Sequence, residues 1–136
     1  MGVRQPCAGG IVLDGRGRLL VIRRGQAPSA GLWSVPGGRC RPDEAPDDAC
    51  VREVAEETGV AVRVLRLAGQ VERDAPDGDV YVIDDFVCAL AGGPAAAPVA
   101  GDDADDARWV TRAELAALEL VPGLWDCLVG WGVLPA

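Results

Sequence analysis

The alternation of apolar and polar residues along the chain predicts a series of short strands. Apolar runs at residues 8–13 and 18–23 flank the turn sequence Asp14-Gly15-Arg16-Gly17, and this combination is typical of a β-hairpin. Further strands are expected at residues 32–35, 60–69, 80–90 and 108–110. The longest of them, residues 80–90, is rich in the β-branched and aromatic residues that favour strands.

Capping signals predict three helices. Pro46 suits a first helical position and Gly59 suits the left-handed residue that closes a helix, so a helix is expected between them. The sequence Thr111-Arg112-Ala113-Glu114 is a capping box and predicts a helix to about Leu118. A last helix is expected after Pro122, where apolar residues recur at helical spacing.

The order of these elements predicts the fold class. Residues 72–79 and most of 91–107 are expected to be loops, because they are rich in turn-forming residues. A hairpin, a strand, a helix, further strands and two helices then follow one another. This order predicts an α/β (α+β) fold, with helices on the faces of a mixed sheet. Because the chain has no internal repeat and no long linker, residues 1–136 are expected to form a single domain.

Composition narrows the possible partners. The net charge is −8 and every basic residue is an arginine. We expect such a chain to bind nucleic acid polymers poorly, because a protein gains most of its affinity for them by neutralising phosphates with positive charge. A small nucleotide can still bind through metal ions and a few arginines. No apolar run approaches the ~20 residues that cross a membrane, and the N-terminus lacks the layout of a secretory signal, so a cytoplasmic location is expected. Without histidine, a Cys/His zinc site is excluded.

Residues 38–60 carry most of the functional signal. They follow the spacing G-x5-E-x7-R-E-U-x-E-E-x-G-U, where U is a bulky aliphatic residue. On a helix, Glu53, Glu56 and Glu57 share one face, opposite an apolar face. Carboxylates at this spacing repel one another unless the face is solvated or neutralised by cations. A solvated acidic face is the alternative interpretation, but hard oxygen ligands on a rigid helix suit Mg²⁺ or Mn²⁺.

The spacing resembles the Nudix box of hydrolases that cleave nucleoside diphosphates linked to another group. Its specified positions are filled by Gly38, Glu44, Arg52, Glu53, Val54, Glu56, Glu57, Gly59 and Val60. The flanking sequences RRGQAPSAGLWSVPGG and D-D-A-R-W-V-x-x-x-E-L are similar to small bacterial members called MutT-like or ADP-ribose pyrophosphatase-like. The resemblance covers most of the chain and implies the α/β/α sandwich of the Nudix fold, with its loop–helix–loop.

The resemblance also implies roles for the box residues. Glu53, Glu56, Glu57 and the carbonyl of Gly38 are expected to bind Mg²⁺, for which Mn²⁺ is a possible substitute. Glu44 is expected as an outer ligand, and Arg52 as a residue that orients the carboxylates. The general base is expected to be Glu53; the alternative is an aspartate of the loop after the sheet, among Asp102, Asp103, Asp105 and Asp106.

Substrate contacts are expected at three further residues. Arg23, or its neighbour Arg24, would hold a phosphate, Trp33 would stack on a base unless it packs in the core, and Asp103 would lie beside the substrate. The implied substrate is a small nucleotide of the ADP-ribose or NDP-sugar type, and the alternative is a nucleoside triphosphate, including an oxidised dNTP. Pro76 stands about where ADP-ribose-hydrolysing relatives have a proline, although an ordinary turn explains it equally well.

Two other functions exist on the same fold. A non-catalytic nucleotide sensor usually loses box glutamates, and this chain retains them. An isomerase of prenyl diphosphates relies on histidine ligands, and this chain contains no histidine. A homodimer is possible, because the apolar C-terminal stretch with Trp125 and Trp131 can serve either as core or as interface.

Overall fold

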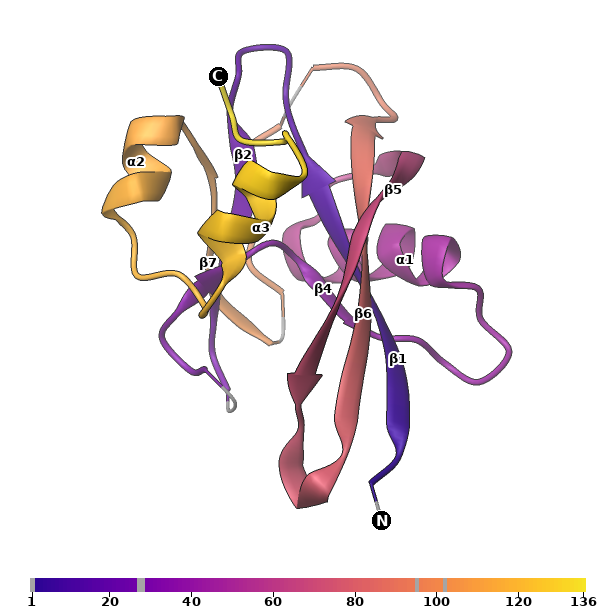
Figure 1. Ribbon diagram of the computed structural model, residues 1–136. Coiled ribbons are helices and arrows are strands. Elements are labelled where there is room, and N and C mark those ends of the chain that lie inside the picture. Colours follow the sequence, from indigo (N-terminus) through magenta and orange to yellow (C-terminus); the bar gives the residue numbers. More distant parts are fainter. Residues whose placement is uncertain (1, 27–28, 95, 102) are drawn as a thin grey trace.

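The computed structural model describes residues 2–26, 29–94, 96–101 and 103–136 and contains two sheets and three α-helices (Figure 1). The elements in chain order are β1 (Arg4–Val12), β2 (Leu19–Arg24), β3 (Trp33–Ser34), β4 (Gly37–Arg39), α1 (Pro46–Thr58), β5 (Val62–Asp74), the 3₁₀ turn η1 (Pro76–Gly78), β6 (Val80–Leu90), β7 (Ala104–Val110), α2 (Arg112–Ala117) and α3 (Leu124–Gly130). One sheet has the order β4-β1-β6-β5, and the other has the order β3-β2-β7.

The larger sheet is mixed, as the sequence predicted. Strand β1 runs parallel to β6, whereas β4 pairs with β1 and β5 pairs with β6 in the antiparallel sense. The smaller sheet is antiparallel throughout. This combination of a mixed sheet with few helices confirms the predicted fold class.

The hairpin predicted from residues 8–23 is wrong in its pairing. The turn is present: both Arg16 and Arg18 donate a backbone N–H to Asp14 Oδ1 at 2.9 Å. The strands on either side nevertheless enter different sheets, and in the described part of the chain they pair with each other only at the bridge from Leu13 to Leu19. The turn sequence determines where the chain reverses, but the partners of β1 come from distant segments.

Two predicted loops are partly strand. Strand β5 continues to Asp74, so residues 72–74 are paired with β6, and only the end of the predicted 72–79 loop forms a turn at η1. Strand β7 begins at Ala104, four residues before the predicted start at Arg108. In both places, backbone pairing to a neighbouring strand outweighs a polar composition that disfavours strands.

The helix ends agree closely with the capping signals. Helix α1 has Pro46 in its first turn, and Gly59 closes it at φ 73°, donating its N–H to the Ala55 carbonyl. The capping box of α2 is complete, because Thr111 Oγ1 accepts from the Glu114 N–H while the Glu114 carboxylate accepts from the Thr111 N–H. No helix in the described ranges is long and apolar enough to cross a membrane.

Two apolar cores lie on opposite faces of the larger sheet. Along β1, Ala8 and Val12 face α1, while Ile11 faces the cluster that contains residues of α2 and α3. The first core includes Cys50 and Val54 of α1, both fully buried. With α1 on one side and α2 and α3 on the other, the sheets form the middle layer of a sandwich (Figure 1).

Candidate active site

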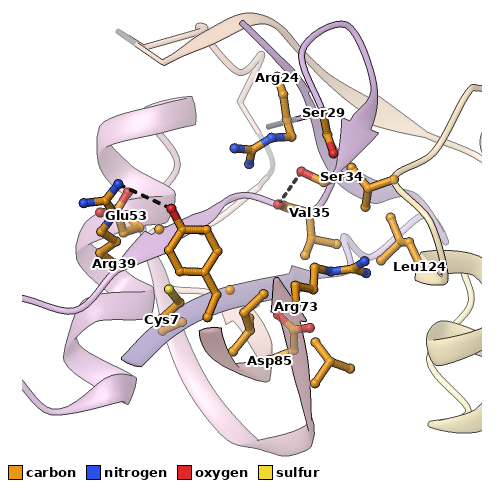
Figure 2. A pocket seen from close by; sticks show the side chains of 18 of the residues that line it. Cys7, Arg24, Ser29, Ser34, Val35, Arg39, Glu53, Arg73, Asp85 and Leu124 are labelled. Atoms are coloured by element: carbon orange, nitrogen blue, oxygen red, sulfur yellow. Dashed lines mark hydrogen bonds between the residues drawn. The ribbon is translucent and has the colours of Figure 1, made fainter. Parts of the chain in front are cut away.

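A cavity of about 720 Å³ lies between the two sheets. Its walls come from β1, the end of β2, β3 and β4, the outer halves of β5 and β6, the exposed acidic side of α1, and the start of α3. Figure 2 shows Glu53 and Arg39 at one end of this cavity and Leu124 at the other. Box residues and a separate set of strand residues therefore share one cavity.

Two of the box glutamates line this cavity. Glu53 and Glu57 lie one helical turn apart on α1 and both face it. Glu57 is only 6% exposed, and its Oε1 accepts the Gly37 backbone N–H at 2.7 Å. This hydrogen bond connects the helix to the turn before it and fixes the position of the carboxylate.

The Gly37-Gly38 pair allows the close approach of α1. A Cβ on Gly38 would lie 2.6 Å from the carboxylate of Glu53, and a Cβ on Gly37 would lie 2.5 Å from the Ala8 carbonyl oxygen. Real side chains do not tolerate such distances. The two glycines are therefore required by contact, and at Gly38 the contact is with a residue of the site.

Arg52 organises the carboxylates around it. Its Nε and Nη2 donate to the two oxygens of Glu44, each at 2.8 Å, and its Nη1 donates to Glu53 Oε1 at 2.8 Å. Arg52 Nη2 also donates to the carbonyl of Arg39 at 3.0 Å, which ties the helix to the end of β4. The Arg52 guanidinium lowers the pKa of Glu44 to about 2. The structure thus places Glu44 against Arg52, outside the cavity lining.

The two carboxylates of α1 that line the cavity have raised pKa values, in contrast to the lowered pKa of Glu44. Burial raises the pKa of Glu57 to about 7; the Gly37 N–H opposes this rise and the charge of Glu53 adds to it. Burial also raises the pKa of Glu53, against the Arg52 guanidinium, which lowers it. The interior end of the cavity therefore contains negative charge that the surrounding residues only partly neutralise.

The third box glutamate points elsewhere. The Glu56 side chain is 50% exposed and pairs with Arg52 at 3.2 Å and Arg41 at 3.3 Å, and it does not line the cavity. Within the described ranges, no three acidic or cysteine side chains stand as a group that could hold a metal ion. Glu57, which is buried and whose pKa the charge of Glu53 raises, and Glu53, which is partly buried, are nevertheless hard oxygen donors of the kind that fit Mg²⁺ or Mn²⁺.

The substrate residues expected from the sequence lie in different environments. Trp33 is 6% exposed in the second core, with the Arg108 guanidinium 5.0 Å from its ring centroid, and does not line the cavity. Arg23 points toward Asp105, with Nε 3.9 Å from the carboxylate, whereas Arg24 lines the cavity. The two arginines are neighbours at the end of β2, where successive side chains point to opposite faces and the register with β7 shifts.

Asp103 does line the cavity, and a backbone contact holds its loop against α1. Gly101 donates its N–H to the Glu57 carbonyl at 2.8 Å, and a Cβ at Gly101 would meet the carbonyl oxygen of Glu56. The other aspartates of this loop differ: Asp106 pairs with Arg108 at 2.7 Å, and Asp102 lies outside the described residues.

Sequence reasoning did not identify the residues of the far half of the cavity. Arg73 of β5 and Tyr81, Ile83 and Asp85 of β6 line it, with Leu124 at the start of α3. One signal was available, because the pair Asp84-Asp85 interrupts the apolar strand 80–90. Since neighbouring strand residues face opposite sides, one of the two aspartates had to point inward.

The family model of the NUDIX domain matches residues 3–128, and the chain therefore belongs to this family. It is 32% identical over 112 residues to the putative 8-oxo-dGTP diphosphatase of Bacillus subtilis, covering 82% of this chain and 69% of that protein. It is 35% identical over 101 residues to the ADP-ribose pyrophosphatase of Methanocaldococcus jannaschii, covering 72% of this chain and 57% of that protein.

A solved structure supports the fold. The MutT protein from Methanosarcina mazei Go1 matches with a TM-score of 0.81 at 24% identity, covering 96% of this chain and 94% of that chain. The curated relatives are longer: the chain spans 51% of the MutT-like protein of Streptomyces ambofaciens, to which it is 42% identical over 84 residues.

Proposed function

We propose that this protein is a pyrophosphohydrolase that depends on a divalent cation and cleaves the diphosphate of a nucleoside diphosphate linked to a second group. The observation that carries this proposal is the position of Glu53 and Glu57, whose carboxylates line one end of a large cavity beside Gly38. Arg24 and Arg39 line the same cavity and supply positive charge for phosphates. The names of the two relatives compared above, a diphosphatase and a pyrophosphatase, support the same reaction class.

The cation we propose is Mg²⁺, with Mn²⁺ as a substitute. Glu53, Glu57 and the carbonyl of Gly38 would hold it; Glu56, expected from the sequence as a further ligand, would have to leave Arg41 and Arg52 and turn toward the cavity. When bound, such a cation neutralises phosphate oxygens and lowers the pKa of the attacking water.

The chain's own residues prepare the site for that chemistry. Arg52 holds the carboxylate of Glu53 through a 2.8 Å hydrogen bond, and Glu44 holds Arg52, so Glu44 and Arg52 are positioning residues. Glu53 is the general base we propose, because burial moves its pKa upward, toward the working pH. Asp103 is the alternative base, since it also lines the cavity.

The second group of the substrate is proposed to be ribose or another sugar, as in ADP-ribose. The relative named as an ADP-ribose pyrophosphatase supports this choice. A nucleoside triphosphate of the type that MutT-like enzymes take is the second candidate. The relative named as a putative 8-oxo-dGTP diphosphatase supports that one. In both cases the nucleoside monophosphate is a product.

The test is nucleotide hydrolysis by wild type and Glu57→Gln, with Mg²⁺ and a coupled phosphatase. The panel contains ADP-ribose, NDP-sugars, the four dNTPs and an oxidised guanine nucleotide. Glu57→Gln should remove nearly all turnover while keeping the fold, because an amide oxygen still accepts the Gly37 N–H. Glu119→Gln, at an exposed position away from the cavity, is the matched control and should behave as wild type. Full activity of Glu57→Gln would refute the metal assignment.

A further inference from the structure

On one face of the larger sheet, residues packed in the second core lie directly beside residues that line the cavity. On this face of β1 and β6, Ile11 and Val87 pack in the second core. The next row across the sheet toward the cavity is Gly9, Asp85 and Gly69, because Asp85 is in register with both glycines. A single carboxylate therefore stands in a row that otherwise lacks side chains.

The two glycines make a niche for this carboxylate. A Cβ on Gly9 would lie 2.3 Å from Asp85 Oδ1, so no larger residue fits beside it. On the other flank, the Trp131 indole lies over Gly69, where a Cβ would be 2.3 Å from its Nε1. The niche is thus closed on both sides, and the remaining direction is the cavity.

Asp85 is 6% exposed, lines the cavity and makes no hydrogen bond or ion pair with any described residue. A buried carboxylate without hydrogen bonds costs several kcal/mol, so such a group points to a ligand. Its neighbour Asp84 is different, because it faces the other side of the sheet and accepts a hydrogen bond from Gln70 at 2.8 Å.

The guanidinium of Arg73 lies on the same wall of the cavity as Asp85. Arg73 of β5 reaches across toward the start of α3, with Nη2 3.9 Å from the place that a Cβ on Gly123 would take. Its charge lowers the pKa of Asp85, although burial raises that pKa to about 7. Figure 2 shows Arg73 and Asp85 together, across the cavity from Arg24 and Ser29. Arg73, too, makes no hydrogen bond or ion pair within the described part of the chain.

The surroundings of the pair are apolar and suit a flat ring. Val35, Val71, Ile83, Val121, Pro122 and Leu124 line the cavity around it. These side chains bury the faces of a base favourably, while Ser34, Glu72 and Asp74 also line the cavity.

We propose that Asp85 and Arg73 form a specificity site for a guanine base at the end of the cavity away from Glu53. Guanine presents two adjacent donors, N1–H and the N2 amino group, which match the two oxygens of a carboxylate. Its O6 is an acceptor next to N1 and matches a guanidinium donor. Adenine presents an acceptor at N1, which would face a carboxylate oxygen. Oxidised guanine retains N1–H, the N2 amino group and O6 and belongs to the same class.

This inference names guanosine as the nucleoside half of the proposed substrate, which favours a GDP-sugar or a guanine nucleoside triphosphate over ADP-ribose, and it rests on the proposed function for its place in the reaction. Its test is separate from hydrolysis. Binding of GMP, IMP and AMP is measured by calorimetry in EDTA at about pH 8.5, above the pKa of Asp85. IMP lacks only the N2 amino group, so the ratio of GMP to IMP affinity reports on the second donor.

Wild type should bind GMP at least about tenfold more tightly than IMP or AMP, because one well-placed base contact changes affinity by about this factor. Asp85→Asn offers one acceptor oxygen in place of two, so its affinities for GMP and IMP should differ by no more than about threefold. Asp84→Asn, the same change on the opposite face of β6, should keep the wild-type ratio. Arg73→Met should weaken GMP and IMP together, because both carry O6.

Equal affinities in wild type, or a preference that survives in Asp85→Asn, would overturn the proposal. So would the failure of every nucleotide to bind in EDTA, because a preformed base site does not need the cation. Ribose 5-phosphate that binds as tightly as GMP and is lost in Asp85→Asn would assign the site to a sugar instead. Glu57→Gln should abolish hydrolysis and leave the GMP-to-IMP ratio unchanged, so each proposal can fail without the other.

Discussion

Gly38→Ala should reduce turnover by displacing one carboxylate while the fold persists. The new Cβ would stand 2.6 Å from Glu53 Oε2, and ordinary van der Waals contact begins at 3.4 Å, so the carboxylate must retreat by about 0.8 Å. Glu53 cannot retreat freely, because Arg52 holds its other oxygen at 2.8 Å. A misplacement near 1 Å in an active site costs up to about a hundredfold in rate. We expect kcat to fall by about tenfold to a hundredfold.

The assay combines phosphate release at saturating substrate with thermal unfolding. Gly38 is not left-handed, so alanine fits its backbone and the melting temperature should change little. Two matched glycine variants serve as controls. Gly15→Ala, whose Cβ meets nothing within 4 Å, should match wild type, and Gly37→Ala should destabilise the fold, because its Cβ meets the backbone of Ala8 and Gly9. A wild-type kcat in Gly38→Ala would refute the claim that the position of Glu53 limits catalysis.

Three further changes test other parts of the site. Arg52→Lys cannot reproduce the two-pronged contact with Glu44 while also reaching Glu53, and steady-state kinetics should show about a tenfold lower kcat with little change in KM. Asp103→Ala should have a small effect on kcat; a loss of about a hundredfold or more would transfer the role of general base from Glu53 to this loop. Asp85 has a folded-state pKa of about 7 against 3.8 when exposed, so the native state binds the extra proton between these values and loses stability as pH rises through them. The melting temperature of Asp85→Asn should therefore exceed that of wild type by a margin that widens up to about pH 7 and then levels; a constant margin would contradict the burial of this charge.

The parts of the molecule that could be predicted from the sequence are those determined by local signals. Pro46 and Gly59 delimit α1 because capping preferences act within a few residues. The same helix then places Glu53 and Glu57 on one side by its 3.6-residue period alone. Spacing could not show that Glu56 turns outward, because that depends on its pairing with Arg41 from the preceding loop.

Long-range pairing determines the rest and leaves little trace in the sequence. The partners of β1 come from β4 and β6, so no pattern near residues 8–23 could have shown that the two strands of the apparent hairpin separate. Arg24 and not Arg23 lines the cavity, and which of the two neighbours faces it depends on where the second sheet lies relative to the first, which the local sequence does not show. Trp33 is drawn into the second core by residues far away in the chain.

The parallel pairing of β1 with β6 also bears on how the protein is made. The Val3 N–H donates to Asp79, 76 residues further along the chain, at the point where the two strands begin to run side by side. A nascent chain emerges from the ribosome N-terminus first, so β1 can pair early with β4, but its other edge must wait until the whole of β6 has been synthesised. Contacts of such wide separation slow folding. During this delay the open edge of β1 can associate with other chains, so a strand that is interior in the finished sheet is exposed to misassembly during synthesis.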